Sequence, residues 1–272
     1  MTLSIRHMTR YTYDPEAAGV SLRLKLFPQS CGSQNVIDWA VTVNEEPVEV
    51  LFIDSGGDAL GQWYKHGLIA EVEIVAEGTI DTTNTAGVLK DLRQQARPAM
   101  YLRETALTKP SDKIHELAGG IGPGETLGRL HELSELVHEA IDYRTGATEN
   151  TTTAAEAAAM GVGVCQDQAH VFVTAARLLD IPARYVTGYL FDPEAEKPTD
   201  QTHAWAEAHV TGLGWVGFDI TNQLCPTEVY VRLCSGLDAA DAAPVRGMVS
   251  GDIEEDMQAQ VSVTQTTSQS QQ

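Results

Sequence analysis

The amino-acid sequence predicts an α+β protein in two parts, an antiparallel β-sandwich followed by a domain that mixes helices and strands. Three observations carry this prediction. Strand-like alternation fills the first third of the chain, amphipathic helical patterns begin near residue 112, and strand-like segments return at residue 184. We therefore expect an amino-terminal β-sandwich domain with its linker over residues 1–105, and a second domain over residues 106–272 that ends in a short disordered tail.

The strand patterns of the first domain are separated by turn residues. Pro28, the run 44–47 and the run 54–58 contain proline, glycine, asparagine or aspartate, which favour turns. Short strands at this spacing are typical of an antiparallel sandwich. The first domain shows no catalytic cluster, so we expect a scaffold or binding role for it. The expected strands are Leu3–Tyr13, Val20–Phe27, Val36–Val43, Val48–Ile53 and Leu68–Val75.

Helical patterns fill the middle of the chain. A short polar helix is expected around Leu89–Gln95, and Ser111 suits the N-cap of a helix over Asp112–Ala118. Apolar residues at helical spacing predict an amphipathic helix over Thr126–Ile141. Thr153 and Glu156 have the spacing of a capping box, which predicts a short alanine-rich helix after Thr153.

A cysteine stands at the start of the next predicted helix. Gly161 and Gly163 give a flexible approach to Cys165, and the apolar spacing predicts a mostly buried helix over Val164–Leu179. A thiol in the first helical turn lies beside unpaired N–H groups and the positive end of the helix dipole, which both favour the nucleophilic thiolate. The same N–H groups are placed to hold an oxyanion. Cys165 is therefore the candidate nucleophile.

Two strand-like segments after this helix carry a histidine and an aspartate. They are Thr202–Val210 with His203 and Trp215–Thr221 with Asp219, and a glycine-rich turn signal separates them. If residues of like parity lie opposite each other, the two side chains are near neighbours on one face, whereas a slip of one residue would separate them. In the favourable register Asp219 would hold the imidazole tautomer and leave the other ring nitrogen for the thiol.

Four motifs, in this order, resemble those of the bacterial transglutaminase-like cysteine peptidase family. They are GVCQDQAH at 163–170, LDIPARYVTGY at 179–189, THAWAE at 202–207 and GWVGFDITN at 214–222. The resemblance implies a papain-like catalytic domain over 106–272. It also implies a triad in which Cys165 is the nucleophile, His203 the general acid and base, and Asp219 the orienting group.

Two residues depart from the family pattern, and the amino-terminal strands match it. Gln168 stands where an aromatic residue is expected, and Ile220 stands where a proline is expected; neither change removes a catalytic group. The strands with Asp38 and Trp39 are similar to the β domain that precedes the catalytic domain in that family.

Three further residues are assigned to the cleft or to the oxyanion site. The resemblance places Tyr143 at the cleft edge, where its hydroxyl would assist the oxyanion hole, with a purely structural tyrosine as an equal alternative. Gln166 directly follows the nucleophile. Trp205 is expected to pack beside His203 and to shield it from water.

Two other polar residues of the predicted helix are given ordinary structural roles. Asp167 is expected to be a carboxylate that complements the helix dipole, in preference to a group that holds the cleft. His170 is expected to be a packed histidine. A metal-dependent hydrolase that uses His170, His203 and Asp219 is the alternative interpretation.

Composition limits the partners and the cofactors. The formal net charge of −20, from 38 acidic and 18 basic residues, argues against nucleic acid and anionic membranes as partners. The first residues lack the apolar core of a secretory signal, and no uncharged apolar run spans a bilayer, so we expect a cytoplasmic location. The sequence contains no zinc-finger spacing and no EF-hand loop, so we expect no metal and no cofactor. The four cysteines do not suggest a disulfide framework; they are Cys31, Cys165, Cys225 and Cys234.

The predicted function is hydrolysis of a peptide or side-chain amide bond in a peptide or protein substrate, through an acyl-enzyme on Cys165. Transamidation, in which an amine replaces water as the acyl acceptor, is one alternative. A non-catalytic binding module on the same fold is another. Hydrolysis is favoured because it requires no pocket for a second substrate.

Overall fold

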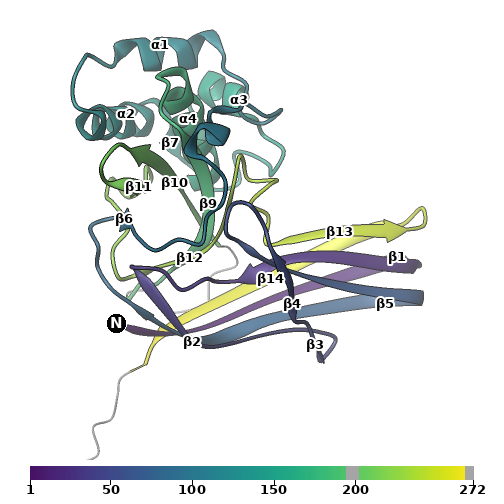
Figure 1. Cartoon of the computed structure of the whole chain (residues 1–272). Coiled ribbons are helices and arrows are strands. Elements are labelled where there is room, and N and C mark those ends of the chain that lie inside the picture. The colour runs from purple at the N-terminus through teal and green to yellow at the C-terminus, as the bar shows by residue number, and fades with distance from the viewer. Residues whose placement is uncertain (194–201, 267–272) are drawn as a thin grey trace, which may run out of the picture.

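The structure of the protein is a computed structural model that describes residues 1–193 and 202–266. Helices and a small sheet lie at one end of the molecule, and a sheet of long strands lies at the other (Figure 1). The predicted tail lies outside the described residues from residue 267 onward. Within the described ranges, no helix is long and apolar enough to cross a membrane.

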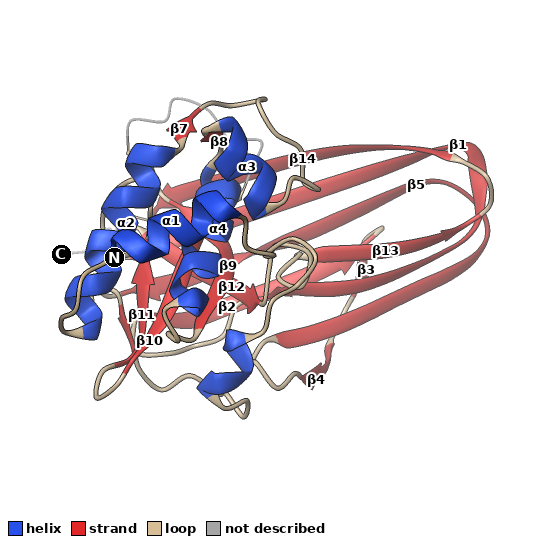
Figure 2. Ribbon diagram, turned by 90° about the horizontal axis from the view of Figure 1, so that it is seen from above, coloured by secondary structure: helices blue, strands red, loops and turns tan. Residues whose placement is uncertain are grey.

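A single antiparallel sheet of seven strands forms the amino-terminal part, so the predicted antiparallel β domain is confirmed. Register irregularities lie between Thr12 and Gly19, and the long strands curve at the end far from the helices (Figure 2). Residues from both halves of these strands share one hydrophobic core. One continuous sheet therefore packs against both sides of that core. The long strands are β1 (Thr2–Phe27) and β5 (Ala59–Thr82), and the others are β2 (Gln34–Val43), β3 (Glu46–Pro47), β4 (Val50–Ile53), β13 (Val245–Ser250) and β14 (Glu254–Gln265).

The last two strands depart from the predicted domain boundary, which assigned all residues after 105 to the second domain. β14 pairs with the first half of β1, and β13 pairs with its second half, so the yellow strands lie beside the purple one in Figure 1. Alternation around Val261 gives β14 an apolar side chain that is buried in the core of this sheet. The segment 245–265 is therefore part of the amino-terminal sheet rather than of the second domain.

A second antiparallel sheet has the strand order β12-β9-β10-β11-β6. The helix predicted around Leu89–Gln95 is wrong. Val88 and Leu89 pair with β11, and Asp91 adopts a left-handed backbone that a helix does not tolerate. The strands are β6 (Val88–Leu89), β9 (Ala183–Leu190), β10 (His203–Val210), β11 (Gly214–Phe218) and β12 (Tyr230–Gly236).

The helices cover one face of this second sheet (Figure 1). The central helix, α4 (Cys165–Leu178), is buried from Asp167 to Arg177 and packs on β10 and β9. Alanines on the facing side of β10 leave room for this close contact. The other helices pack around α4, and they are α1 (Asp112–Gly120), α2 (Thr126–Ala140) and α3 (Ala154–Met160), with a 3-10 turn at Pro98–Leu102.

The predicted helix starts agree with the structure. Ser111 is the N-cap of α1, and Thr153 and Glu156 form the capping box of α3. After α3, Gly161 turns the chain in a left-handed conformation toward Cys165. The first turn of α4 is thereby placed beside β10, where the histidine lies.

Candidate active site

Cys165 is the first residue of α4, and its thiol is free and partly buried. It packs in a small cluster with Ala169, Tyr185 and Ala204. The backbone N–H groups of Asp167 and Gln168 donate to the Val164 carbonyl, which leaves those of Cys165 and Gln166 as the donors without an acceptor inside the helix. The thiol therefore lies where the helix dipole and these donors favour negative charge.

Asp167 fixes the approach to Cys165. Its Oδ2 accepts hydrogen bonds from the Val164 backbone N–H at 2.8 Å and from the Thr148 hydroxyl at 2.6 Å. Gly163 is required here because a Cβ at that position would lie 2.7 Å from the Asp167 Cβ. Burial raises the pKa of Asp167, and these hydrogen bonds oppose the rise. Asp167 lies in the first turn of α4, as expected of a helix-dipole carboxylate, but its side chain is fully buried and also holds the loop before the nucleophile.

A short parallel strand pair brings Tyr143 to the same place. β7 (Asp142–Tyr143) pairs with β8 (Val162–Gly163), so Tyr143 lies opposite Gly163. About half of Tyr143 is exposed, and partial burial and the neighbouring Cys165 both raise the pKa of its phenol. Tyr143 therefore lies at the rim beside the thiol.

Gln166 is directed away from the thiol. Its side-chain amide donates to the Asn150 carbonyl at 3.3 Å, in the loop that precedes α3. The residue can thus contribute its backbone N–H at the start of the helix, while its side chain anchors this loop.

His203 and Asp219 are brought together by the pairing of β10 with β11. The pairs Ala206 with Phe218 and Glu207 with Gly217 give the like-parity register that the prediction required. His203 Nε2 lies 2.6 Å from Asp219 Oδ2. The Cys165 side chain is close enough to the His203 ring to raise the pKa of the imidazole. Because Nε2 is engaged by Asp219, Nδ1 is the ring nitrogen left for the thiol.

The charges of this pair favour an imidazolium. Burial lowers the pKa of His203, but hydrogen bonds and charge interactions with Asp219 and Cys165 outweigh it and raise the pKa to about 10. Burial raises the pKa of Asp219, while hydrogen bonds from His203 and its other donors bring the pKa below the usual value. His203 therefore carries a proton at neutral pH beside a buried carboxylate.

Two donors to Asp219 were not identified from the sequence. The Tyr230 hydroxyl lies 2.6 Å from Oδ2, and the Asn222 side-chain amide lies 2.7 Å from it. The backbone N–H of Asn222 donates to Oδ1 at 3.1 Å. Asn222 ends the fourth motif, three residues after Asp219, so the sequence alone could have indicated it as a donor. Tyr230 lies outside the four motifs, and no sequence pattern links it to Asp219.

Trp205 packs beside His203, as expected. The two ring centroids are 6.2 Å apart, and Tyr230 contacts the indole edge-on at 5.7 Å. Gly188 makes room for the indole, because a Cβ there would lie 2.4 Å from a ring atom. Trp205 and Tyr230 also line a small pocket that neither Cys165 nor His203 lines. This pocket therefore adjoins the residues behind the triad and does not reach the thiol.

The two departures from the family pattern are accommodated by buried contacts. The Gln168 amide donates to the Ile141 carbonyl at 2.9 Å and accepts from the Thr221 hydroxyl at 2.7 Å. This side chain ties α4 to the residues that follow Asp219. Ile220 is buried in the helical core.

His170 is a packed residue of α4. Its Nε2 accepts from the Ala239 backbone N–H at 2.9 Å, and burial lowers its pKa to about 4. Within residues 1–193 and 202–266, no three His, Cys, Asp or Glu side chains gather closely enough to hold a metal ion. The alternative ligand set of His170, His203 and Asp219 is not assembled.

Comparison with known proteins identifies two family regions. Residues 115–220 match the model of the transglutaminase-like superfamily, and residues 3–81 match the bacterial transglutaminase-like N-terminal region. These regions contain the candidate site and the core strands of the amino-terminal sheet, respectively.

Relatives match the chain along its length. An uncharacterized protein of Mycobacterium leprae is 27% identical over 282 residues, which cover 96% of this chain and 98% of that protein. An uncharacterized protein of Mycobacterium tuberculosis is 26% identical over 274 residues, covering 90% of this chain and 86% of that protein.

A solved structure shows the same fold. The crystal structure of a "putative cysteine protease" from Cytophaga hutchinsonii has a TM-score of 0.75 and 23% identity, and the match covers 98% of this chain and 92% of that chain. The two parts of the fold therefore occur together in that structure as well. With both regions matched in order, the chain belongs to the bacterial transglutaminase-like family.

Proposed function

We propose that the protein is a cysteine-dependent hydrolase of peptide or side-chain amide bonds in a peptide or protein substrate. One observation supports this proposal above the others. Cys165 at the start of a buried helix lies close enough to His203 to raise the pKa of its imidazole, and His203 Nε2 lies 2.6 Å from the buried Asp219 carboxylate. An activated thiol paired with an oriented histidine is the arrangement that nucleophilic acyl transfer requires.

In the proposed acylation step, the Cys165 thiolate attacks the amide carbonyl carbon and forms the C–S bond. The carbonyl π electrons move to oxygen, where backbone N–H groups of the first turn of α4 would stabilise the oxyanion. The oxyanion then collapses and the C–N bond breaks. The His203 imidazolium donates its proton to the leaving nitrogen, which leaves a thioester on Cys165.

In the proposed deacylation step, water attacks the thioester carbonyl. Neutral His203 accepts the proton of that water, and collapse of the second tetrahedral intermediate breaks the C–S bond. The thiolate and the imidazolium are restored, and a carboxylic acid leaves. Asp219 stays ionised throughout and holds the ring in the orientation that presents Nδ1 to the thiol.

The experiment compares wild type with Cys165→Ala on a mixture of unfolded peptides, with products identified by mass spectrometry. We expect cleaved peptides or deamidated side chains from wild type only, and a thioester adduct on Cys165 after rapid acid quenching. Turnover that survives in Cys165→Ala would overturn the proposal. Adding a primary amine to the wild-type reaction tests the acceptor, since amine incorporation in place of hydrolysis would show transamidation.

A further inference from the structure

The carboxylate of Asp219 is held from two parts of the fold. His203 and Asn222 come from β10 and from the turn after β11. The third donor, Tyr230, is the first residue of β12, and its hydroxyl lies 2.6 Å from the same Oδ2 atom that accepts from His203. The position of Oδ2 therefore depends on the position of β12.

The strand β12 is at the edge of the second sheet, and the amino-terminal sheet supplies partners for its outer side. Among the described strands, β12 pairs only with β9. The Gln34 side-chain amide of β2 accepts from the Arg232 backbone N–H at 2.8 Å and donates to the Arg232 carbonyl at 2.8 Å. Asp58 accepts from the Ser235 backbone N–H at 2.8 Å. The Gln34 amide thus takes the place of a neighbouring strand.

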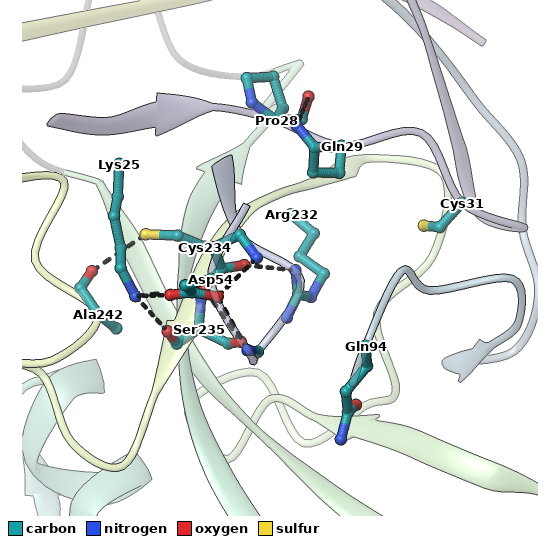
Figure 3. A network of polar contacts seen from close by, with 12 residues as sticks. Lys25, Pro28, Gln29, Cys31, Asp54, Gln94, Arg232, Cys234, Ser235 and Ala242 are labelled. Atoms are coloured by element: carbon teal, nitrogen blue, oxygen red, sulfur yellow. Dashed lines mark hydrogen bonds and ion pairs between the residues drawn. The ribbon is translucent and has the colours of Figure 1, made fainter. Parts of the chain in front are cut away.

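Buried charges also join β12 to the amino-terminal sheet. Arg232 donates to Glu207 at 2.9 Å and lies 3.4 Å from Asp58, which follows β4. Lys25 of β1 lies 3.0 Å from Asp54 (Figure 3), and it lies 3.5 Å from Asp58. Separating buried partners would leave uncompensated charges, which is costly. Tyr230 therefore sits on a strand that is fastened to the amino-terminal sheet two residues away.

We propose that Tyr230 is a positioning residue through which the amino-terminal β domain sets the geometry of Asp219 and His203. The inference rests on the proposed function, because it concerns the same triad. Without the phenol hydroxyl, Oδ2 loses its only side-chain donor from β12, and the carboxylate is held by residues of its own hairpin. The imidazole that it orients then loses alignment with the thiol, and small displacements of catalytic groups have large effects on rate.

The test is the pH profile of iodoacetamide alkylation at Cys165 in Tyr230→Phe. We expect alkylation near pH 6 to be roughly tenfold slower than in wild type, because one buried charge-assisted hydrogen bond is lost. Tyr189→Phe is the matched control, since Tyr189 is also buried and its hydroxyl contacts His7 instead of Asp219. A Tyr230→Phe profile within about twofold of wild type would overturn the inference.

A second variant tests the part played by the β domain. Gln34 is far from Cys165 in the sequence. Gln34→Leu keeps the side chain similar in size but removes both hydrogen bonds to Arg232. We expect Gln34→Leu to slow alkylation of Cys165 near pH 6 to the same extent. We expect the double variant Gln34→Leu/Tyr230→Phe to be slowed by less than the product of the two single fold-changes, because both variants act through the same contact. An unchanged profile in folded Gln34→Leu would overturn the role of the β domain.

The outcomes separate this inference from the proposed function. If wild-type Cys165 is alkylated faster than the other cysteines and Tyr230→Phe reacts within about twofold of the wild-type rate, only the positioning role is overturned. If wild-type Cys165 is alkylated no faster than the other cysteines, the proposed function and the positioning role are both overturned.

Discussion

His203 Nε2 lies 2.6 Å from Asp219 Oδ2, and the carboxylate of Asp219 is completely buried. A buried acceptor at this distance selects one tautomer of the ring and leaves Nδ1 for the thiol. The geometry and the charge of this pair predict the effect of replacing Asp219 and the effect of raising the pH.

Replacing Asp219 by Asn removes the charge that orients and stabilises the imidazolium. We expect kcat to fall by roughly 10³-fold or more, as in triads that lose their orienting carboxylate. Asp180→Asn is the control, because Asp180 is exposed and its left-handed backbone suits Asn. Steady-state kinetics on an identified amide substrate would measure both. A loss below about tenfold in Asp219→Asn would speak against the orienting role.

The protonation of His203 predicts how stability changes with pH. Its folded-state pKa of about 10 lies above the ordinary value of 6.5. The stabilisation from the bound proton is therefore complete below pH 6.5 and is lost as the pH rises through 10. Relative to His203→Gln, wild type should lose a few kcal/mol of unfolding free energy between pH 7 and pH 10. Urea unfolding at both pH values checks this, and a constant difference would contradict it.

The buried carboxylate of Glu207 holds two guanidinium groups. Arg184 donates to Glu207 at 2.6 Å and Arg232 donates to it at 2.9 Å, with Glu207 and Arg184 fully buried. Glu207→Gln should cost about 3–5 kcal/mol of unfolding free energy, because the buried Arg184 loses its counter-charge and Arg232 keeps only the more distant Asp58. Glu77→Gln in the exposed Arg6–Glu77 pair should change it by less than about 1 kcal/mol. Equal effects in the two variants would contradict this account.

The loop before the nucleophile depends on Asp167. Asp167→Ala should cost about 1–2 kcal/mol, because the Val164 N–H loses its buried acceptor. It should also slow alkylation of Cys165, since the first turn of α4 is no longer held. Glu156→Ala is a matched control, because Glu156 caps α3 in the same way but lies on the surface. If both variants leave Cys165 equally reactive, Asp167 has no role in placing the thiol.

Local patterns in the sequence predicted much of this structure. Helical spacing and capping residues marked the starts of α1, α2 and α3, and Cys165 was placed at a helix start on the same grounds. The parity of His203 and Asp219 predicted one shared face, given the right register. The polar run near Asp91 predicts a helix, but Asp91 has a left-handed backbone, which composition does not reveal.

Contacts between distant segments were not predictable from those patterns. Gln34 and Arg232 are 198 residues apart in the chain, and neither has a periodic signal that points to the other. The donation from Tyr230 to Asp219 depends on the pairing of β12 with β9. The burial of Asp167 depends on Thr148 and on the absence of a side chain at Gly163. These relationships follow from tertiary packing, which overrides local preference.

The most direct test of the central claim is the pH dependence of alkylation at each cysteine, with mass spectrometry locating the label and His203→Ala measured alongside. Near pH 6, Cys165 should react far faster than the other three, because His203 stabilises its thiolate, and this lead should disappear in His203→Ala. If Cys165 reacts no faster than the partly buried Cys31, or keeps its lead without His203, the thiolate–imidazolium pair is not present.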